Sequence, residues 1–263
     1  YGPYIVVISL TSLCFHGITD DPFTPFFDYG DVFFMQIAWF QGQAYSQKQW
    51  AAFRHWQETA KTAVLPTGPM HELFQTFPAT DWFPLKTKFL VQTNRFYVFP
   101  RESLSTNFGD SGTHVRGTSF FQVPLQTRRT RFRFQPLADA VAVYDSFQEM
   151  LPGRVNRLTD QLADYEFTVD LHGTRSPANI PTEFVLTTQE MHNPLATFGL
   201  ERRPLLDNVI HQQPGHGLNF GRTADLDQSW RARLRAASRR HAYFARRQVG
   251  LRRRLKWWLG KWL

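Results

Sequence analysis

The sequence is poor in cysteine, and this shortage limits the chemistry that it can support. Cys14 is the only cysteine among 263 residues, so neither an intramolecular disulfide nor a cysteine-based metal site can form. Its position between Leu13 and Phe15 favours a buried, inert thiol. A single thiol also fits a reducing compartment such as the cytoplasm.

Long apolar runs and several catalytic motifs are also missing. The longest apolar stretch, residues 4–13, is diluted by serine and threonine and falls short of the roughly 20 apolar residues of a transmembrane helix. The sequence contains no G-x-S-x-G, G-x-x-x-x-G-K-[ST], G-x-G-x-x-G or H-E-x-x-H pattern. Serine hydrolase, P-loop ATPase and Rossmann dehydrogenase assignments therefore lose their usual support.

Acidic residues are absent from the last part of the chain. The last one is Asp227, and residues 229–263 contain twelve lysines and arginines. The first 228 residues carry a net charge of −4, so the overall excess of +8 comes entirely from this tail. Partners that are attracted by positive charge are therefore expected at the tail.

Apolar and aromatic side chains, in contrast, are plentiful, and 16% of the residues are Phe, Trp or Tyr. Such a chain can bury enough surface to fold. Its periodicity and turn residues predict alternating strands and helices, and hence an α/β fold with a mixed sheet. Strands are expected within residues 4–15, 96–99, 131–134, 141–144, 165–171 and 182–188, helices at 47–61, 85–95, 145–151 and 155–163, and irregular structure at 194–222.

The start of the helix expected at residues 47–61 carries the clearest local signal. Ser46 and Gln49 form an S-x-x-Q capping box, in which each residue satisfies a free backbone amide of the first turn. Apolar residues then recur at helical spacing and predict one buried face, made by Trp50, Phe53 and Trp56.

Directly before this helix, residues 39–43 read Trp-Phe-Gln-Gly-Gln. Aromatic faces stack on sugar rings, and amides form hydrogen bonds with hydroxyl groups. Trp39, Gln41, Gln43 and Trp50 are therefore candidate sugar-binding residues. The alternative is that the tryptophans belong to the core and the glutamines cap a turn.

A polar loop follows the strand expected at residues 96–99. Gly109 and Gly112 permit tight turns near a ligand, and Asp110 and His114 could bind a divalent cation. His114 could instead contact a diphosphate. A purely structural turn would look similar, so the residues alone leave these interpretations open.

Other polar residues are candidates for acid–base chemistry. Asp145 and Glu149 lie one turn apart on an expected helix, where paired carboxylates can transfer protons, although a solvated helix face is the commoner arrangement. Asp170 and His172 follow an expected strand, where sites of α/β proteins often lie, but Asp170 could equally cap the turn. His16 is expected to be a structural residue.

Several short runs follow one another in a particular order. They lie at residues 38–43, 94–100 (Asn-Arg-Phe-Tyr-Val-Phe-Pro), 105–114 (Ser-Thr-Asn-Phe-Gly-Asp-Ser-Gly-Thr-His), 143–147 and 169–173. In order and spacing they resemble the C-terminal part of bacterial family-2-type glycosyltransferases, over roughly residues 33–188. That family has a Ser-Trp-Gly-Gln-like turn before a Trp-rich helix, a strand ending in Tyr-Pro, a Ser-x-Asn-x-Gly run, Gly-Thr-His, Tyr-Asp-x-Phe and Asp-Leu-Tyr-Gly.

The resemblance implies a GT-A fold, a nucleotide-diphospho-sugar donor, Mn²⁺ or Mg²⁺, and a role in cell-surface polysaccharide synthesis. We accordingly expect a partial GT-A-like mixed sheet with flanking helices in residues 1–125, an α/β extension in 126–228 and a basic amphipathic helix in 229–263. The metal-binding D-x-D motif belongs to the front half of the family's fold and does not occur here. We therefore expect the donor-binding half to lie outside this sequence and these residues alone to lack transferase activity.

The resemblance also implies a set of site residues. Gln43, Trp50, Asn107, Gly112 and His114 match family positions near the active site. The complete substrate-binding set that we predict is Trp39, Gln41, Gln43, Trp50, Asn107, Gly112, Thr113 and His114, with His114 also a candidate metal ligand. Phe40 and the inserted Gln41 depart from the family's Ser-Trp-Gly pattern, and the resemblance assigns no acid as the catalytic base.

The basic tail has the pattern of an interfacial helix. Leucine and tryptophan recur on one helical face, and arginine and lysine occupy the rest. Each basic side chain near an anionic leaflet contributes about 1 kcal/mol to binding. The expected membrane contacts are Trp257, Trp258, Trp262, Arg252, Arg253 and Arg254.

Together these patterns predict a peripheral protein at the cytoplasmic face of the membrane, which transfers a sugar to a glycan or lipid-linked acceptor. The main alternative is a non-catalytic carbohydrate-binding module that uses the same Trp and Gln residues. The second is a protein that binds nucleic acid through its basic tail. Segregation of the Trp and Leu residues on one face disfavours nucleic acid.

Overall fold

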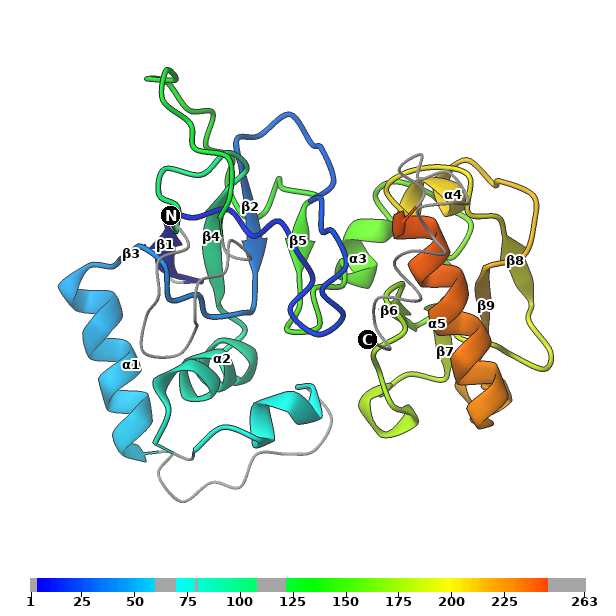
Figure 1. The fold of residues 1–263 in the computed structure, drawn as a ribbon. Helices are drawn as coiled ribbons and strands as arrows, with labels where there is room; N and C mark the ends of the chain where they lie inside the picture. The colour runs from blue at the N-terminus through cyan, green and yellow to red at the C-terminus, as the bar shows by residue number, and fades with distance from the viewer. Residues whose placement is uncertain (1–3, 60–69, 79, 108–121, 246–263) are drawn as a thin grey trace, which may run out of the picture.

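The computed structural model describes residues 4–59, 70–78, 80–107 and 122–245. Over these ranges the chain forms two mixed β-sheets with helices around them, as Figure 1 shows. The α/β class predicted from the sequence is therefore confirmed. Gly112, Thr113 and His114 lie outside the described residues, as do all six residues expected at a membrane.

The first sheet has five strands in the order β3-β1-β4-β2-β5. β1 runs parallel to β4, β2 runs antiparallel to β4, and β5 runs parallel to β2. All residues of β2 and β4 are buried, which explains their uninterrupted apolar sequences. The strands are β1 (Ile5–Ser9), β2 (Val32–Met35), β3 (Gln43–Ala44), β4 (Phe96–Pro100) and β5 (Val143–Tyr144).

Two helices, α1 (Gln47–Thr59) and α2 (Trp82–Gln92), pack against each other beside this sheet, and a 3₁₀ helix (Glu72–Gln75) lies between them in the chain. The predicted capping box is present: the Ser46 amide donates to Gln49 Oε1 at 2.7 Å, and the Gln49 amide donates to Ser46 Oγ at 3.3 Å. α2 begins three residues before its predicted start because Asp81 caps it, accepting from the Phe83 amide.

The second sheet has four strands in the order β6-β7-β9-β8, and the long helix α5 lies in front of it in Figure 1. One continuous cluster of buried apolar side chains runs through both sheets. Within the described ranges, no helix combines the length and apolarity that crossing a membrane requires. The elements are α3 (Pro152–Val155), β6 (Phe167–Asp170), β7 (Phe184–Thr187), β8 (Ala196–Phe198), α4 (Leu206–Ile210), β9 (Leu218–Arg222) and α5 (Trp230–Ala245), with 3₁₀ helices at Pro177–Asn179 and Thr223–Asp225.

Several sequence-based predictions in the middle of the chain are wrong. Residues 145–151 form a tight turn instead of a helix, because the Asp145 carboxylate accepts from the Phe147 and Glu149 amides and Gln148 adopts a φ of 60°. Residues 155–163 contain only the end of α3, followed by turns.

Three further predictions are corrected. Residues 131–134 form no strand, because the Arg133 backbone pairs with Asp31 of a loop instead of with a neighbouring strand. Residues 194–222 are not irregular, since they contain β8, α4 and β9. Cys14 is exposed, contrary to the buried thiol that its apolar neighbours suggested.

Candidate functional site

Three segments that are far apart in the sequence meet at one edge of the first sheet. Because β1 and β4 are parallel, the loops that follow them leave the sheet on the same side. The Leu10 carbonyl accepts from the Leu104 amide at 2.7 Å and the Ser105 amide at 3.2 Å, while the Leu10 amide donates to the Gly42 carbonyl at 2.8 Å. We call residues 10–12, 41–43 and 103–107 the sheet-edge site.

Side chains tie these three segments together. The Thr11 hydroxyl donates to the Gln41 carbonyl at 2.8 Å and shares a 2.6 Å hydrogen bond with the Ser105 hydroxyl. The Ser12 amide donates to Ser103 Oγ at 2.6 Å. The turn predicted to bind sugar and the loop that carries Asn107 are thus fixed next to each other.

Gly42 makes this close approach possible. Its φ is +64°, and a Cβ atom there would lie 2.8 Å from Ser105 Oγ and 3.0 Å from the Leu10 Cβ. A larger residue would therefore be strained in its backbone and would also push the loop away. The sequence signal at this position, a glycine between two glutamines, reflects a packing requirement of the site.

The two glutamines beside Gly42 differ in their surroundings. Gln43 Oε1 accepts from the Tyr97 hydroxyl at 2.9 Å, which fixes the orientation of its amide. The amide oxygen and nitrogen of Gln41 are shielded from solvent, and neither has a hydrogen-bond partner among the described residues. An unpaired buried amide is costly, and a ligand hydroxyl would satisfy it.

The remaining predicted residues occupy different places. Trp39 is buried, with Phe40 stacked on it at a centroid distance of 4.7 Å. Trp50, on the first turn of α1, is 41% exposed and stacks on Tyr45, so this pair presents an open aromatic surface. Asn107 lies at the end of the described part of its loop.

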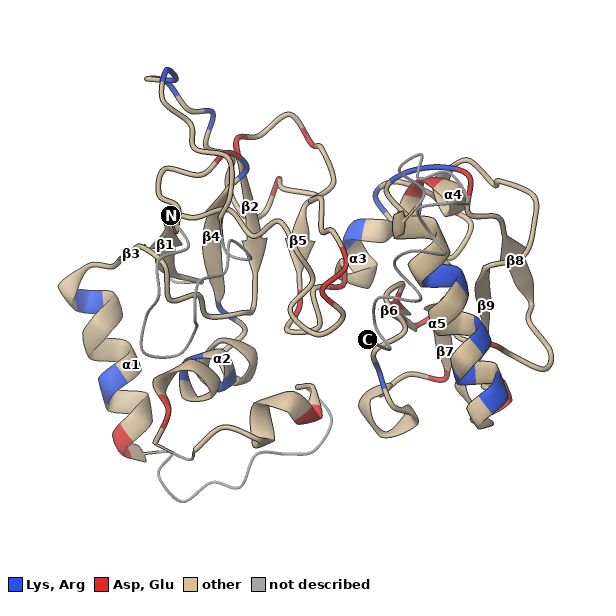
Figure 2. Cartoon of the chain, in the orientation of Figure 1, with Lys and Arg blue, Asp and Glu red and all other residues tan. Residues whose placement is uncertain are grey.

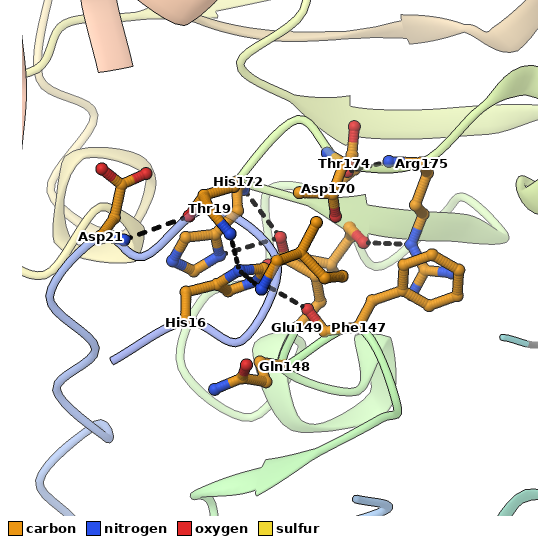
Figure 3. A network of polar contacts seen from close by, with 12 residues as sticks. His16, Thr19, Asp21, Phe147, Gln148, Glu149, Asp170, His172, Thr174 and Arg175 are labelled. Carbon is orange, nitrogen blue, oxygen red and sulfur yellow. Dashed lines mark hydrogen bonds and ion pairs between the residues drawn. The ribbon is translucent and has the colours of Figure 1, made fainter. Parts of the chain in front are cut away.

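A second polar site joins the two sheets, and the sequence did not predict the contacts that form it. His16 follows β1, Glu149 lies in the turn after β5, and His172 follows β6 (Figure 3). All three are buried. Glu149 Oε1 lies 2.7 Å from the His172 amide and 3.0 Å from His172 Nδ1, and the two imidazole rings stack at 4.1 Å. We call these three residues the junction cluster.

Burial determines the protonation of this cluster. Desolvation, aided by the neighbouring His172, lowers the pKa of His16 to about 3. Desolvation likewise lowers the pKa of His172 to about 4, and it raises the pKa of Glu149. At neutral pH both imidazoles are therefore uncharged, and the contact between His172 and Glu149 is a hydrogen bond to a neutral ring.

The junction cluster has the composition of a metal site but not its arrangement. One ligand atom of each residue lies within 4.8 Å of the others, and two imidazoles with a carboxylate suit zinc or iron. However, His16 Nε2 is 2.9 Å from the Phe147 carbonyl, and its Nδ1 accepts from the Ile18 and Thr19 amides. The imidazole planes differ by only 24°, so their in-plane lone pairs do not converge.

The oxygen-rich coordination of Mg²⁺ and Mn²⁺ does not fit this pair of histidines either. The cluster instead forms a hydrogen-bonded joint between the two sheets.

The predicted acids around the joint are structural. The carboxylate of Asp170 accepts from the Thr174 and Arg175 amides and from the side chains of Thr187 and Gln189, at 2.7 to 3.0 Å. Its role is therefore to hold the turn after β6, the alternative that the sequence left open. Burial raises its pKa to about 6.

Asp145 and Glu149 are not a solvated pair on a helix. Asp145 forms an ion pair with the buried Arg175, while Glu149 is 1% exposed and bonds to His172. The sequence showed that Glu149 and His172 each follow an expected strand. It did not show that the two side chains meet.

Comparison with known proteins identifies no relative of this chain. It matches no protein-family model, no curated protein and no solved structure.

Proposed function

We propose that this chain forms the acceptor-side part of a nucleotide-sugar-dependent glycosyltransferase with a GT-A-like sheet. The observation that carries the proposal is the meeting of residues 41–43 with residues 103–107 at the carboxyl edge of β1 and β4. Ligands of α/β proteins bind at such edges. Both segments contribute to the resemblance to family-2 enzymes, although about 60 residues separate them in the chain.

The chemistry of the sheet-edge site and of the aromatic pair Tyr45 and Trp50 supports a sugar ligand. The unpaired Gln41 amide can bond a hydroxyl group through both its oxygen and its nitrogen. The exposed faces of Tyr45 and Trp50 can stack on the apolar face of a sugar ring. In this proposal the substrates are a nucleotide-diphospho-sugar donor and a glycan or lipid-linked acceptor.

The proposal includes attachment to the cytoplasmic face of an anionic membrane. Arginines gather along α5 in Figure 2, and this helix exposes Trp230 and Leu234, which lie four residues apart on one face. The basic segment that follows α5 extends the same composition. A tether of this kind would hold the sheet-edge site close to a lipid-linked acceptor.

The test is transfer of labelled sugar from a panel of nucleotide-sugars to lipid-linked acceptors in vesicles. It uses the protein made from the whole natural reading frame that encodes this chain. We expect Gln41→Ala to lower kcat/KM about tenfold, because a lost hydrogen bond of about 1.4 kcal/mol corresponds to that factor.

The control is Gln47→Ala, at an exposed position on α1, which should stay within about twofold of the unchanged protein. If no donor supports transfer, the proposed glycosyltransferase activity is refuted. Glycan binding that is independent of any nucleotide-sugar would then favour a carbohydrate-binding module.

A further inference from the structure

Lys86 of α2 is a buried cation. Its residue is 3% exposed, and its ammonium group has no ion pair or hydrogen bond within the part of the chain that the structure describes. Lysine is almost never fully buried unless it is paired. The other buried cation described above, Arg175, follows this rule through Asp145.

Aromatic rings surround the Lys86 ammonium. Nζ lies over the rings of Tyr45, Phe53, Trp50 and Tyr97, at 4.3, 5.2, 5.5 and 5.8 Å from their centroids. These contacts offset part of the lost hydration, but rings attract an ammonium less strongly than water does. Among the described residues, the positive charge of Lys86 is therefore only partly compensated.

This charge lies next to the candidate sugar-binding surface. Tyr45 and Trp50, which cover Nζ, are 44% and 41% exposed and stack on each other with an interplanar angle of 11°. Tyr97, which also faces Nζ, fixes the Gln43 side chain by donating to its oxygen. The Gln43 amide nitrogen then remains as a donor among the described residues.

We propose that Lys86 and the Gln43 amide bind the phosphate group of a sugar phosphate whose ring rests on Tyr45 and Trp50. A lysine acts as a compact point charge that suits phosphate, and its flexible stem lets Nζ move from beneath Tyr45 to an entering phosphate. This specifies the acceptor class for the proposed function: a phosphorylated sugar, as in a lipid-linked acceptor.

The test measures binding to the full chain at pH 7 by calorimetry. The ligands are the 1-phosphates of glucose, galactose and mannose, with the three free hexoses and inorganic phosphate for comparison. We expect at least one hexose phosphate to bind ten times more tightly than its hexose and than phosphate. Lys86→Met should weaken this binding at least tenfold, whereas Lys48→Met, at an exposed position of α1, should leave it within twofold.

Three results would overturn the proposal: no binding of any hexose phosphate, equal binding of hexose phosphate and inorganic phosphate, or unchanged binding by Lys86→Met. The unliganded Lys86→Met protein should melt at the same temperature as the unchanged protein or higher, because it loses an unpaired buried charge. A lower melting temperature with unchanged binding would make Lys86 a structural residue.

A measurement on the unchanged protein covers the case in which Lys86→Met does not fold. Burial lowers the pKa of Lys86 to about 8, whereas an ordinary lysine titrates near 10.4. Hexose phosphate affinity should therefore fall at least tenfold between pH 7 and pH 10, and a constant affinity would refute the role of Lys86.

The sugar part of this inference rests on the proposed function, but the two fail differently. If the protein transfers sugar but Lys86 does not affect binding, only the assignment of Lys86 to a phosphate site is refuted. If binding depends on Lys86 but the protein transfers no sugar, the proposed glycosyltransferase activity is refuted and the phosphate site remains.

Discussion

The neutral histidine His172 makes the stability of the protein depend on pH. Its pKa is about 4 in the folded protein and near 6.5 in an unfolded chain. The unfolded state therefore binds a proton more readily, so the contribution of His172 is complete above pH 6.5 and is lost as the pH falls towards 4. The charged or titratable groups that face it are His16, Glu149, Asp21, Arg240 and Asp145.

The prediction is that His172→Asn flattens this pH dependence. The free energy of unfolding, measured in urea from pH 7 to 4, should lose a slope of up to about 1.4 kcal/mol per pH unit, the value for one proton. The total acid-sensitive contribution of His172 amounts to at most about 3 kcal/mol.

His216→Asn provides the control, because His216 is exposed. Its curve should follow that of the unchanged protein. Identical slopes in all three proteins would show that the pKa of His172 is the same in the folded and the unfolded state. Glu149 opposes the effect, since its raised pKa favours the folded state in acid.

At this scale the sequence indicated the residues but not their contacts. His16 and Glu149 have ordinary sequence neighbours, and the partner of Glu149, His172, is 23 positions away. These residues are buried by segments that are distant in the chain, so the spacing of apolar residues around them does not reveal their burial. Gly42 was recognisable because its neighbours, glutamine and aromatic residues, already suggested a turn.

The exposed face of α5 leads to a prediction for a single element. If Trp230 and Leu234 enter the membrane interface, replacing both with alanine should reduce co-sedimentation with anionic vesicles several-fold. Leu195→Ala is a matched control, since Leu195 is 57% exposed and lies between β7 and β8.

The vesicle experiment has clear alternatives. Equal binding to neutral and anionic vesicles, or none, would contradict the anionic membrane partner. Tail-dependent binding of DNA or RNA with a steep salt dependence would favour the nucleic-acid alternative instead.

Elements with strong local signals were predicted from the sequence. The helix α1 was correct because its capping box, Ser46 with Gln49, acts within the first turn. The strand β4 was correct because a run of buried apolar residues ends at Pro100. The helix predicted at residues 145–151 was wrong. The Asp145 side chain accepts hydrogen bonds from the Phe147 and Glu149 backbone amides, which favours a turn over a helix. β8 and β9 were missed because proline and glycine surround them.

At the scale of the whole molecule, Arg240 connects three segments. Its Nε donates to Asp21 Oδ2 at 2.9 Å, and its Nη1 donates to the His172 carbonyl at 2.7 Å. Phe244, one turn further along α5, stacks on the His172 ring. One helix thus secures the loop after β1 and the loop after β6.

We predict that Arg240→Gln lowers the free energy of unfolding by about 2 kcal/mol, because it leaves the buried Asp21 carboxylate without its partner. Arg233→Gln, on the exposed side of α5, should change it by less than about 0.5 kcal/mol. Urea denaturation measures both, and equal losses would contradict the role assigned to Arg240.

The contact between Asp21 and Arg240 also has a consequence for synthesis, since 219 positions separate the two residues. A ribosome that adds about 5 to 20 residues per second needs about 10 to 40 s to cover that distance. The loop after β1 therefore leaves the ribosome well before the helix that secures it. Until α5 is made and docks, the loop that carries His16 lacks this contact and is open to chaperones and proteases.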